Sequence, residues 1–370
     1  MEVVFRADAS LQIGTGHVMR CLTLAGALAA HGATCVFICR AHQGNLLELI
    51  RDKGYVAHAL EANQTSFGAS SPAITAFGEE QAQPHSHWLG VTQAEDVEDC
   101  MPILARMQPD WLIVDHYALD ACWESALKPH CSRLMVIDDL VDRLHVCDLL
   151  LDQTFGRQPE DYRAWVPVHC RLLCGSQYAL LRPEFAALRS YSLERRVTPQ
   201  LRRLLITMGG VDKDNATGQV LEALRNSPLP TGCRVTVVMG ATAPWLVDVR
   251  NQAQGMPWPT RVLVGVDDMA QLMADSDLAI GAAGSTSWEL CCLGVPSLLL
   301  CTAANQRTVI AALASASAAV KLDQAALSQP YAAQFRAQLV ELIDNLEAYA
   351  VAAARVIDGR GASRVCVQLV

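Results

Sequence analysis

The feature that most restricts the fold is a repeated alternation of short apolar runs with longer segments of helical periodicity. In the first half, apolar runs at residues 34–39, 111–115 and 134–137 are each bounded by turn-forming or polar residues and separated by segments with helical spacing of apolar side chains. Strands that alternate with helices form parallel sheets, because each crossover helix returns the chain to the end of the sheet at which the preceding strand began. The sequence therefore predicts an α/β fold.

The second half repeats this pattern and indicates a second domain. Strand-like runs recur at residues 204–208, 234–239, 261–264, 278–280 and 295–300. Residues 188–203 are charged, contain Pro199 and lack apolar periodicity, as expected of a domain boundary. The 370 residues also exceed the roughly 250–300 that one hydrophobic core holds. We therefore expect two doubly wound parallel-sheet domains facing a cleft, at residues 1–190 and 200–370.

Composition excludes several classes of protein. Hydrophobic residues make up 51% and charged residues 18%, which suits buried parallel sheets, and the net charge of −9 disfavours a nucleic-acid partner. No run reaches about 18 consecutive apolar residues, so we expect no membrane insertion and a cytoplasmic location. The 14 cysteines are scattered through apolar contexts, and the pairs Cys35/Cys39 and Cys170/Cys174 lack a partner pair at zinc-finger spacing. We expect reduced core cysteines rather than disulfides or structural zinc.

The turn after the first strand carries the first candidate for catalysis. Gly14-Thr15-Gly16 precedes His17, which starts a helical segment at the carboxyl end of a strand, where open α/β sheets bind ligands. Met19 occupies the third glycine position of the dinucleotide-binding fingerprint, so a dehydrogenase is disfavoured. A histidine at this position either caps the helix or serves as a general base, and we favour the base.

Polar residues follow other strands of the first half. Because parallel strands end at one edge of a sheet, we expect several of them to share a rim with His17: Asp115, His116, Tyr117, Asp138 and Asp139. Each could instead be a satisfied loop residue or a helix cap. Residues 60–86 lack periodicity and predict a surface loop, in which His85 and His87 are expected to be solvated.

Two small-residue turns in the second half predict a diphosphate site. Gly209-Gly210 and residues 281–287 follow strands, and small side chains let a ligand approach backbone N–H groups. Neither turn has the Lys-Ser/Thr of a nucleoside-triphosphate loop, and Glu289 follows where a carboxylate could bind ribose hydroxyls. Asp212-Lys213-Asp214 matches a metal-binding Asp-x-Asp motif, but helix capping explains these aspartates equally well.

These segments closely resemble a known family. The distinctive strings are RADASLQIGTGHVMRCLTLA, VDHYALDACWE, IDDLVDRLHVCDLLLDQ, MGGVDKDNATG, GAAGSTSWELCCLGVPSLLL and ANQ. They resemble the hydrolases of pseudaminic acid biosynthesis that act on UDP-2,4-diacetamido-2,4,6-trideoxy-β-L-altropyranose. The resemblance implies the two-domain GT-B glycosyltransferase fold, similar to the peptidoglycan enzyme that transfers GlcNAc from UDP-GlcNAc. It also implies release of UDP and the free sugar with inversion, without a metal or other cofactor.

The resemblance also implies roles for individual residues. His17 is the implied base that activates water, Tyr117 lies beside the sugar, and Asn305 makes a polar contact near the reacting centre. The other implied substrate- and UDP-binding residues are Gly14, Gly16, Arg182, Gly209, Gly210, Gly284, Ser285, Thr286, Glu289 and Gln306. For Arg182 the contact is with the diphosphate or the sugar.

Three alternatives stay open at the level of sequence. A GT-B glycosyltransferase would use the same UDP-sugar site but pass the sugar to an acceptor. A nucleotide-sugar binding module would have no turnover, and a UDP-sugar epimerase of the same fold would be expected to place more carboxylates in its cleft. The sequence does not fix the oligomeric state or the sugar's configuration, and we expect a monomer.

Overall fold

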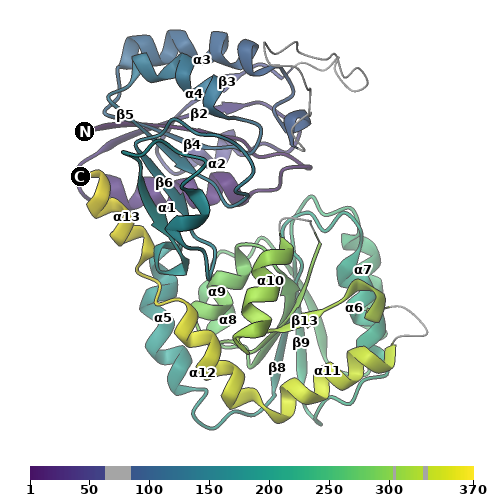
Figure 1. Cartoon of the computed structure of the whole chain (residues 1–370). Coiled ribbons are helices and arrows are strands. Elements are labelled where there is room, and N and C mark those ends of the chain that lie inside the picture. Colours follow the sequence, from purple (N-terminus) through teal and green to yellow (C-terminus); the bar gives the residue numbers. More distant parts are fainter. Residues whose placement is uncertain (63–84, 303–305, 328–331) are drawn as a thin grey trace. The chain divides into compact units, whose positions relative to one another are not determined.

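The computed structural model describes residues 1–62, 85–302, 306–327 and 332–370 (Figure 1). The chain forms two compact units. The first comprises residues 1–153, 157–178 and 362–370, and the second comprises residues 154–156 and 179–361. Each unit is built on one parallel sheet, so the predicted pair of doubly wound α/β domains is confirmed.

The first unit contains a seven-stranded sheet in the order β3-β2-β1-β4-β5-β6-β7. Its strands are β1 (Glu2–Ala7), β2 (Thr34–Arg40), β3 (Val56–Leu60), β4 (Trp111–Asp115), β5 (Arg133–Ile137), β6 (Leu149–Asp152) and β7 (Arg171–Cys174). Its helices are α1 (Gly16–Ala29), α2 (Leu47–Asp52), α3 (Gln93–Met107), α4 (Ala121–Leu127) and α13 (Gly361–Leu369). Short 3₁₀ turns lie at Ser86–Trp88, Lys128–His130, Pro159–Tyr162 and Ser176–Tyr178. Helices α3 and α4 cover one face of this sheet, and α1 and α13 cover the other (Figure 1).

The second unit contains a six-stranded sheet in the order β10-β9-β8-β11-β12-β13. Its strands are β8 (Arg203–Thr207), β9 (Arg234–Met239), β10 (Thr260–Val264), β11 (Leu278–Ala282), β12 (Ser297–Leu300) and β13 (Val320–Leu322). Its helices are α5 (Pro183–Glu194), α6 (Ala216–Arg225), α7 (Leu246–Gln254), α8 (Met269–Ala274), α9 (Thr286–Cys292), α10 (Gln306–Ser315), α11 (Ala332–Asp344) and α12 (Leu346–Val356), with a 3₁₀ turn at Gln324–Leu327. Strand β13 lies between α10 and this 3₁₀ turn.

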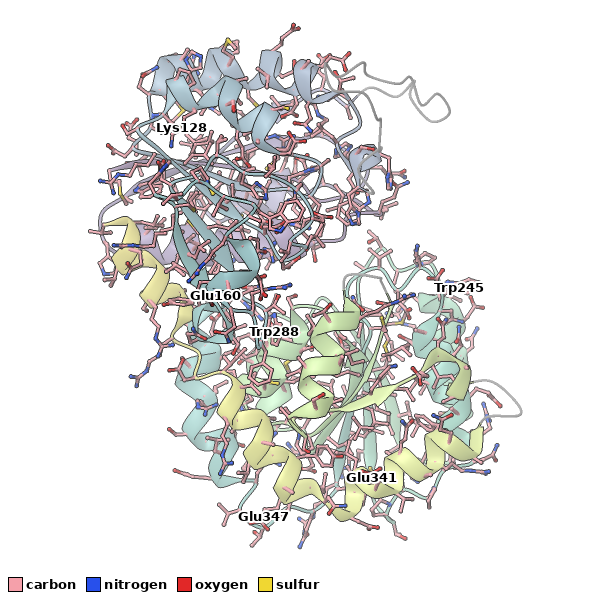
Figure 2. All side chains as sticks on the ribbon, viewed as in Figure 1. Lys128, Glu160, Trp245, Trp288, Glu341 and Glu347 are labelled. Carbon is pink, nitrogen blue, oxygen red and sulfur yellow. The ribbon has the colours of Figure 1, made fainter. Side chains whose placement is uncertain are left out.

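The alternation of side chains along β8 explains how both faces of the second sheet are buried. Leu204 and Ile206 join the apolar cluster formed with α6, α7 and α11, whereas Leu205 joins the cluster formed with α5, α8, α9 and α10. Trp288 of α9 lies inside the unit, while Glu341 and Glu347 lie on its outer helices (Figure 2). Successive residues of a strand therefore contribute alternately to the two apolar layers.

The two units differ from the predicted division at residues 190–200 in three places, of which residues 154–156 form the shortest segment. Helix α5 belongs to the second unit, where the Arg189 guanidinium donates to the carbonyl oxygens of Ile357 (2.9 Å) and Ala354 (2.6 Å). Helix α13 belongs to the first unit, where the Trp111 indole N–H donates to the Leu369 carbonyl at 3.0 Å. These contacts join segments far apart in the sequence, and local periodicity carries no signal for them.

Candidate functional site

The first candidate cluster lies at the topological switch point of the first sheet, between the neighbouring strands β1 and β4. β1 and β4 are neighbours, but β1 leads through α1 to β2 on one side and β4 leads through α4 to β5 on the other. Loops diverge at such a switch point and leave room for ligands at the carboxyl ends of the strands. His17 lies in the first turn of α1, and Asp115 is the last residue of β4.

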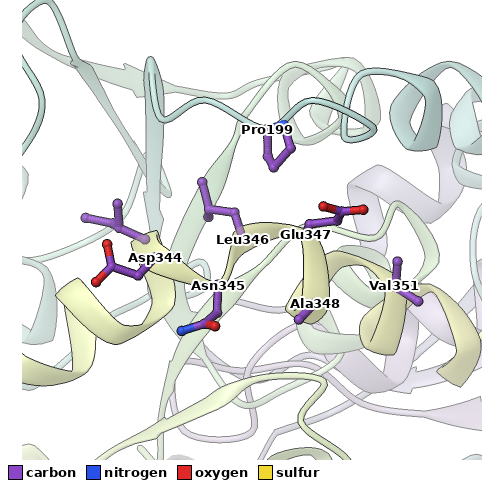
Figure 3. A pocket seen from close by; sticks show the side chains of 8 residues that line it. Pro199, Asp344, Asn345, Leu346, Glu347, Ala348 and Val351 are labelled. Carbon is purple, nitrogen blue, oxygen red and sulfur yellow. The ribbon is translucent and has the colours of Figure 1, made fainter.

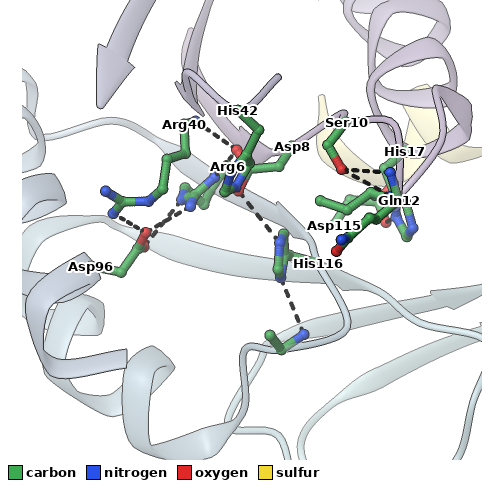
Figure 4. A network of polar contacts seen from close by, with 12 residues as sticks. Arg6, Asp8, Ser10, Gln12, His17, Arg40, His42, Asp96, Asp115 and His116 are labelled. Carbon is green, nitrogen blue, oxygen red and sulfur yellow. Dashed lines mark hydrogen bonds and ion pairs between the residues drawn. The ribbon is translucent and has the colours of Figure 1, made fainter. Parts of the chain in front are cut away.

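His17 and Asp115 form a buried pair at this point (Figure 4). Asp115 Oδ1 lies 2.6 Å from His17 Nδ1, and the Arg20 guanidinium donates to both Asp115 oxygens at 2.6 Å. Burial raises the pKa of Asp115, but the charges of Arg20 and His17 outweigh it and hold that pKa well below its ordinary value. An ionised Asp115 accepts the proton of Nδ1, which leaves Nε2 of His17 as the proton acceptor.

Tyr117 supports the same pair from the loop after β4. Its ring lies edge-on to the His17 ring, with centroids 4.6 Å apart, and its hydroxyl donates to Asp139 at 2.5 Å. The other oxygen of Asp139 lies 3.2 Å from Arg20. Burial, followed by the charge of Asp139, raises the pKa of Tyr117 well above its ordinary value, so the phenol stays protonated. Of the predicted rim residues, His17, Asp115, Tyr117 and Asp139 thus form one connected cluster, whereas Asp138 pairs with Arg143 at 2.8 Å.

Sequence reasoning missed an aromatic layer beside this cluster. Trp88 stacks on Tyr117 with centroids 5.6 Å apart and meets His17 edge-on at 6.2 Å. His85 lies 4.5 Å from Trp88 and 5.3 Å from Tyr117, and burial lowers its pKa. His85 is therefore only partly solvated, because the rings of Trp88 and Tyr117 pack against it, whereas His87 is exposed as expected. A tryptophan in a segment otherwise rich in polar residues was the available signal.

His116 belongs to a second buried network next to the first (Figure 4). Its Nδ1 accepts the Ala118 backbone N–H at 3.1 Å, so the proton of the neutral ring is on Nε2, which lies 3.4 Å from Asp8 Oδ2. Arg6 lies 2.6 Å from the other Asp8 oxygen. Burial lowers the pKa of His116, consistent with a neutral ring.

The same network contains residue types that could bind a metal ion. Asp8, His42 and His116 superficially match a two-histidine, one-carboxylate ligand set. However, a His116 Nε2 that carries a proton has no lone pair for a metal, and no group of candidate ligands in the described part of the chain has the geometry of a metal site. The network instead fixes Asp8, which precedes the Gly14–Gly16 turn.

The two predicted glycine turns of the second unit lie at the corresponding switch point, where β8 and β11 are neighbours. Gly209 has φ of +89°, which suits glycine, and Gly210 follows it. A Cβ on Gly240 would lie only 1.9 Å from the Gly210 carbonyl oxygen, so Gly240 must also lack a side chain. Gly284 and Ser285 follow β11 and precede α9. Both turns therefore present backbone at one edge of the second sheet.

Asp212 is a helix cap in this structure. Its carboxylate accepts the backbone N–H groups of Ala216 at 2.8 Å and Thr217 at 2.9 Å, at the start of α6. Of the two interpretations of the Asp-x-Asp string, these bonds support capping, because both carboxylate oxygens of Asp212 are engaged by the helix N-terminus.

The remaining predicted residues of the second unit are partly brought together. Arg182 lies 3.7 Å from Glu289, and burial raises the pKa of Glu289 to about 7, although the Arg182 charge opposes this shift. The Gln306 amide lies 3.7 Å from the position of a Cβ on Gly284, and its carbonyl oxygen accepts the Thr302 N–H at 2.8 Å. Thr286 begins α9 and is half-buried. Asn305 lies outside the described residues.

A surface hollow of about 700 Å³ lies elsewhere, at the junction of α11 and α12 (Figure 3). Pro199, which lines it, precedes β8, so the hollow lies at the amino ends of the strands rather than near Gly209. Its lining contains the carboxylates Asp344 and Glu347 and no cationic side chain. This chemistry does not suit a diphosphate.

Comparison with known proteins confirms the resemblance drawn from the sequence motifs. No family model matches the sequence. The chain is 25% identical over 315 residues to the UDP-2,4-diacetamido-2,4,6-trideoxy-beta-L-altropyranose hydrolase of Campylobacter jejuni, covering 85% of this chain and 96% of that protein. It is 22% identical over 304 residues to the uncharacterized protein MJ1062 of Methanocaldococcus jannaschii, covering 81% of this chain but only 55% of that protein. The chain thus spans about half the length of the archaeal relative.

Solved structures confirm the predicted GT-B class of fold. MurG of Acinetobacter baumannii aligns with a TM-score of 0.69 at 15% identity, covering 100% of this chain and 99% of that chain. The spinosyn rhamnosyltransferase SpnG aligns with a TM-score of 0.63 at 16% identity, covering 100% of both chains. At these identities the likeness concerns the fold alone. Within the described ranges, no helix has both the length and the apolar character needed to cross a membrane.

Proposed function

We propose that this chain is an enzyme that hydrolyses a UDP-linked 2,4-diacetamido-2,4,6-trideoxy sugar to UDP and the free sugar, in pseudaminic or a related nonulosonic acid pathway. The observation that carries the proposal is the His17–Asp115 pair at the switch point of the first sheet, with Arg20 holding both oxygens of Asp115. The 25% identity to the Campylobacter jejuni hydrolase, over nearly all of that protein, supports the substrate class.

The pair can supply a general base for water. Asp115 holds the proton on Nδ1 of His17, so Nε2 removes a proton as the water oxygen attacks the anomeric carbon. The bond from that carbon to the diphosphate oxygen breaks, and its electrons leave with UDP. Asp115 stabilises the imidazolium that forms. Because UDP is a good leaving group, activation of water is the step that most needs help, and attack opposite UDP inverts the anomeric carbon.

UDP is assigned to the second unit. Backbone N–H groups near Gly209 and Gly284 are proposed to hold the diphosphate, with Arg182 contributing positive charge. Glu289 is proposed to accept hydrogen bonds from the ribose hydroxyls. Asp212 is engaged by α6, and the proposed reaction assigns no role to a metal.

Incubation of the purified protein with the UDP-diacetamido sugar tests the proposal. We expect UDP release without any acceptor, and NMR spectroscopy of the first product should show inversion at the anomeric carbon. His17→Asn should retain UDP binding and lose turnover. Turnover close to that of the unsubstituted protein would refute the base assignment, and release only from another nucleotide sugar would refute the substrate assignment.

A glycosyltransferase is the second candidate, because MurG and SpnG share the fold over the whole chain. The two activities differ in whether UDP release requires an acceptor alcohol. Release that starts only when an acceptor is added, with the sugar recovered on that acceptor, would favour transfer over hydrolysis.

A further inference from the structure

Two cysteines meet at the edge of the first sheet where β6 and β7 begin. Cys147 lies two residues before β6, and Cys170 immediately precedes β7. The strands are parallel, with Leu149 opposite Arg171, and the Arg171 N–H donates to the Asp148 carbonyl at 2.9 Å. This register places the two sulfur atoms 3.5 Å apart. The sequence paired Cys170 with Cys174 only as a metal-ligand spacing, whereas the fold brings Cys147 to Cys170.

The surroundings of the two thiols differ. Cys147 is fully buried in the apolar core of the first unit, whereas Cys170 is only half-buried. The contact with Cys170, followed by burial, raises the pKa of Cys147 well above its ordinary value. Cys147 is therefore a protonated thiol that an oxidant in solution reaches poorly, while Cys170 is accessible.

We propose that Cys147 and Cys170 form a reversible disulfide when a hydroperoxide oxidises the protein. The Cys170 sulfur attacks the peroxide oxygen, which gives a sulfenic acid and one water when the peroxide is H₂O₂. The Cys147 sulfur then attacks the Cys170 sulfur, and the displaced hydroxide takes the Cys147 proton and leaves as a second water. Two thiols are oxidised and one peroxide is reduced. The sulfur atoms need to approach by only about 1.5 Å to reach bonding distance.

The positions of the two cysteines predict which properties of the protein the disulfide changes. Both cysteines lie at the amino ends of their strands, whereas His17 and Asp115 lie at the carboxyl ends of the same parallel sheet. The disulfide would close a loop from residue 147 to residue 170, which includes β6 and the connection to β7. Within that connection, the Tyr162 hydroxyl is hydrogen-bonded to Asp138 and Asp152. We expect a higher Tm in the oxidised protein and an unchanged rate of UDP release, because loop closure restricts the unfolded chain.

Peptide mapping of the full chain tests the proposal. The protein is treated with a small molar excess of H₂O₂, blocked with N-ethylmaleimide and digested with trypsin without reduction. Cleavage after Arg143, Arg157, Arg163 and Arg171 separates the two cysteines, so the disulfide should join the peptides 144–157 and 164–171. Dithiothreitol should release them and return Tm to its starting value. Cys122→Ser, which removes an exposed cysteine, is the matched control and should leave the linked pair in place.

Two further variants test the role of each cysteine in the proposed disulfide. Cys147→Ser should leave Cys170 as a sulfenic acid that dimedone traps, because the second sulfur is gone. Cys170→Ser should abolish both the linked pair and the rise in Tm. Recovery of both thiols in blocked form after peroxide treatment, or linkage of Cys170 to Cys174 or Cys131 instead, would overturn the assignment even if either variant folds poorly.

Discussion

Asp115 Oδ1 lies 2.6 Å from Nδ1 of His17, although 98 residues separate them in the chain. The pairing depends on β4 lying directly beside β1, since this order places the end of β4 next to the first turn of α1. Arg20, one turn after His17 on the same helix, then reaches both oxygens of the same carboxylate. The proton on His17 is therefore held by groups from two elements that only the sheet order brings together.

Replacing Asp115 by Asn should reduce kcat by about 10²- to 10⁴-fold. The amide cannot accept the Nδ1 proton as a carboxylate does, so the imidazole loses its preferred tautomer and the charge that stabilises its protonated form. Arg20 also loses a buried ionic partner, which should lower the free energy of unfolding by about 3–5 kcal/mol. Steady-state kinetics and chemical denaturation measure the two effects. UDP affinity, measured by calorimetry, should not change, and an unchanged kcat would show that Asp115 does not act through His17.

Tyr117→Phe separates two roles for this side chain. The hydroxyl is bonded to Asp139 and the ring packs on His17, so we expect loss of the hydroxyl to reduce kcat by less than about tenfold. Tyr117→Ala also removes the ring and should reduce kcat much further. KM for the UDP-sugar should stay nearly constant in the phenylalanine variant. A large rise in KM with kcat preserved would instead mean that the hydroxyl contacts the sugar directly.

The sequence predicted the rim but not its internal connections. Polar residues after buried strands indicated that His17, Asp115, Tyr117 and Asp139 would share one edge, because parallel strands end together. Which carboxylate faces His17 depends on the sheet order, and that order arises from contacts between distant segments. The role of Arg20 was missed because an arginine in an amphipathic helix is ordinarily solvated.

The aromatic layer was missed for a different reason, because only the identity of Trp88 signalled it and no periodicity did. Trp88 lies in a short 3₁₀ turn, and His85 is the residue before that turn. No helical or strand periodicity in this segment indicates which side chains face the interior. Both are half-buried because they pack on Tyr117, which belongs to another loop. Periodicity therefore predicted both sheets, while residues in irregular segments required the tertiary structure.

Trp88→Ala should raise KM for the UDP-sugar while leaving the affinity for UDP unchanged. The ring stacks on Tyr117 and meets His17 edge-on, so its removal frees both side chains to move on the sugar side of the proposed site. We expect a rise in KM of about tenfold, corresponding to about 1.4 kcal/mol. Initial-rate kinetics and UDP calorimetry provide the two measurements. His87→Ala is the matched control, because His87 lies in the same turn but is exposed. Equal effects of the two substitutions would point to general disruption of the turn.

Glu289 should make the stability of the second unit depend on pH. Burial raises its pKa to about 7 from an ordinary value of 4.5, so the folded protein binds more protons than the unfolded chain between these values. The contribution of Glu289 is fully present below pH 4.5 and is lost as the pH rises through 7. It amounts to at most about 3 kcal/mol.

Glu289→Gln tests this linkage by removing the titration while retaining a side chain of similar size. Urea unfolding of both proteins at several pH values gives the difference in their free energies of unfolding, in which the titrations of other groups cancel. This difference should shift in favour of Glu289→Gln as the pH rises from 4.5 to 7.5, since the half-buried carboxylate becomes costly only when it ionises. A difference independent of pH would mean that Arg182, 3.7 Å away, compensates the carboxylate charge fully in the folded protein.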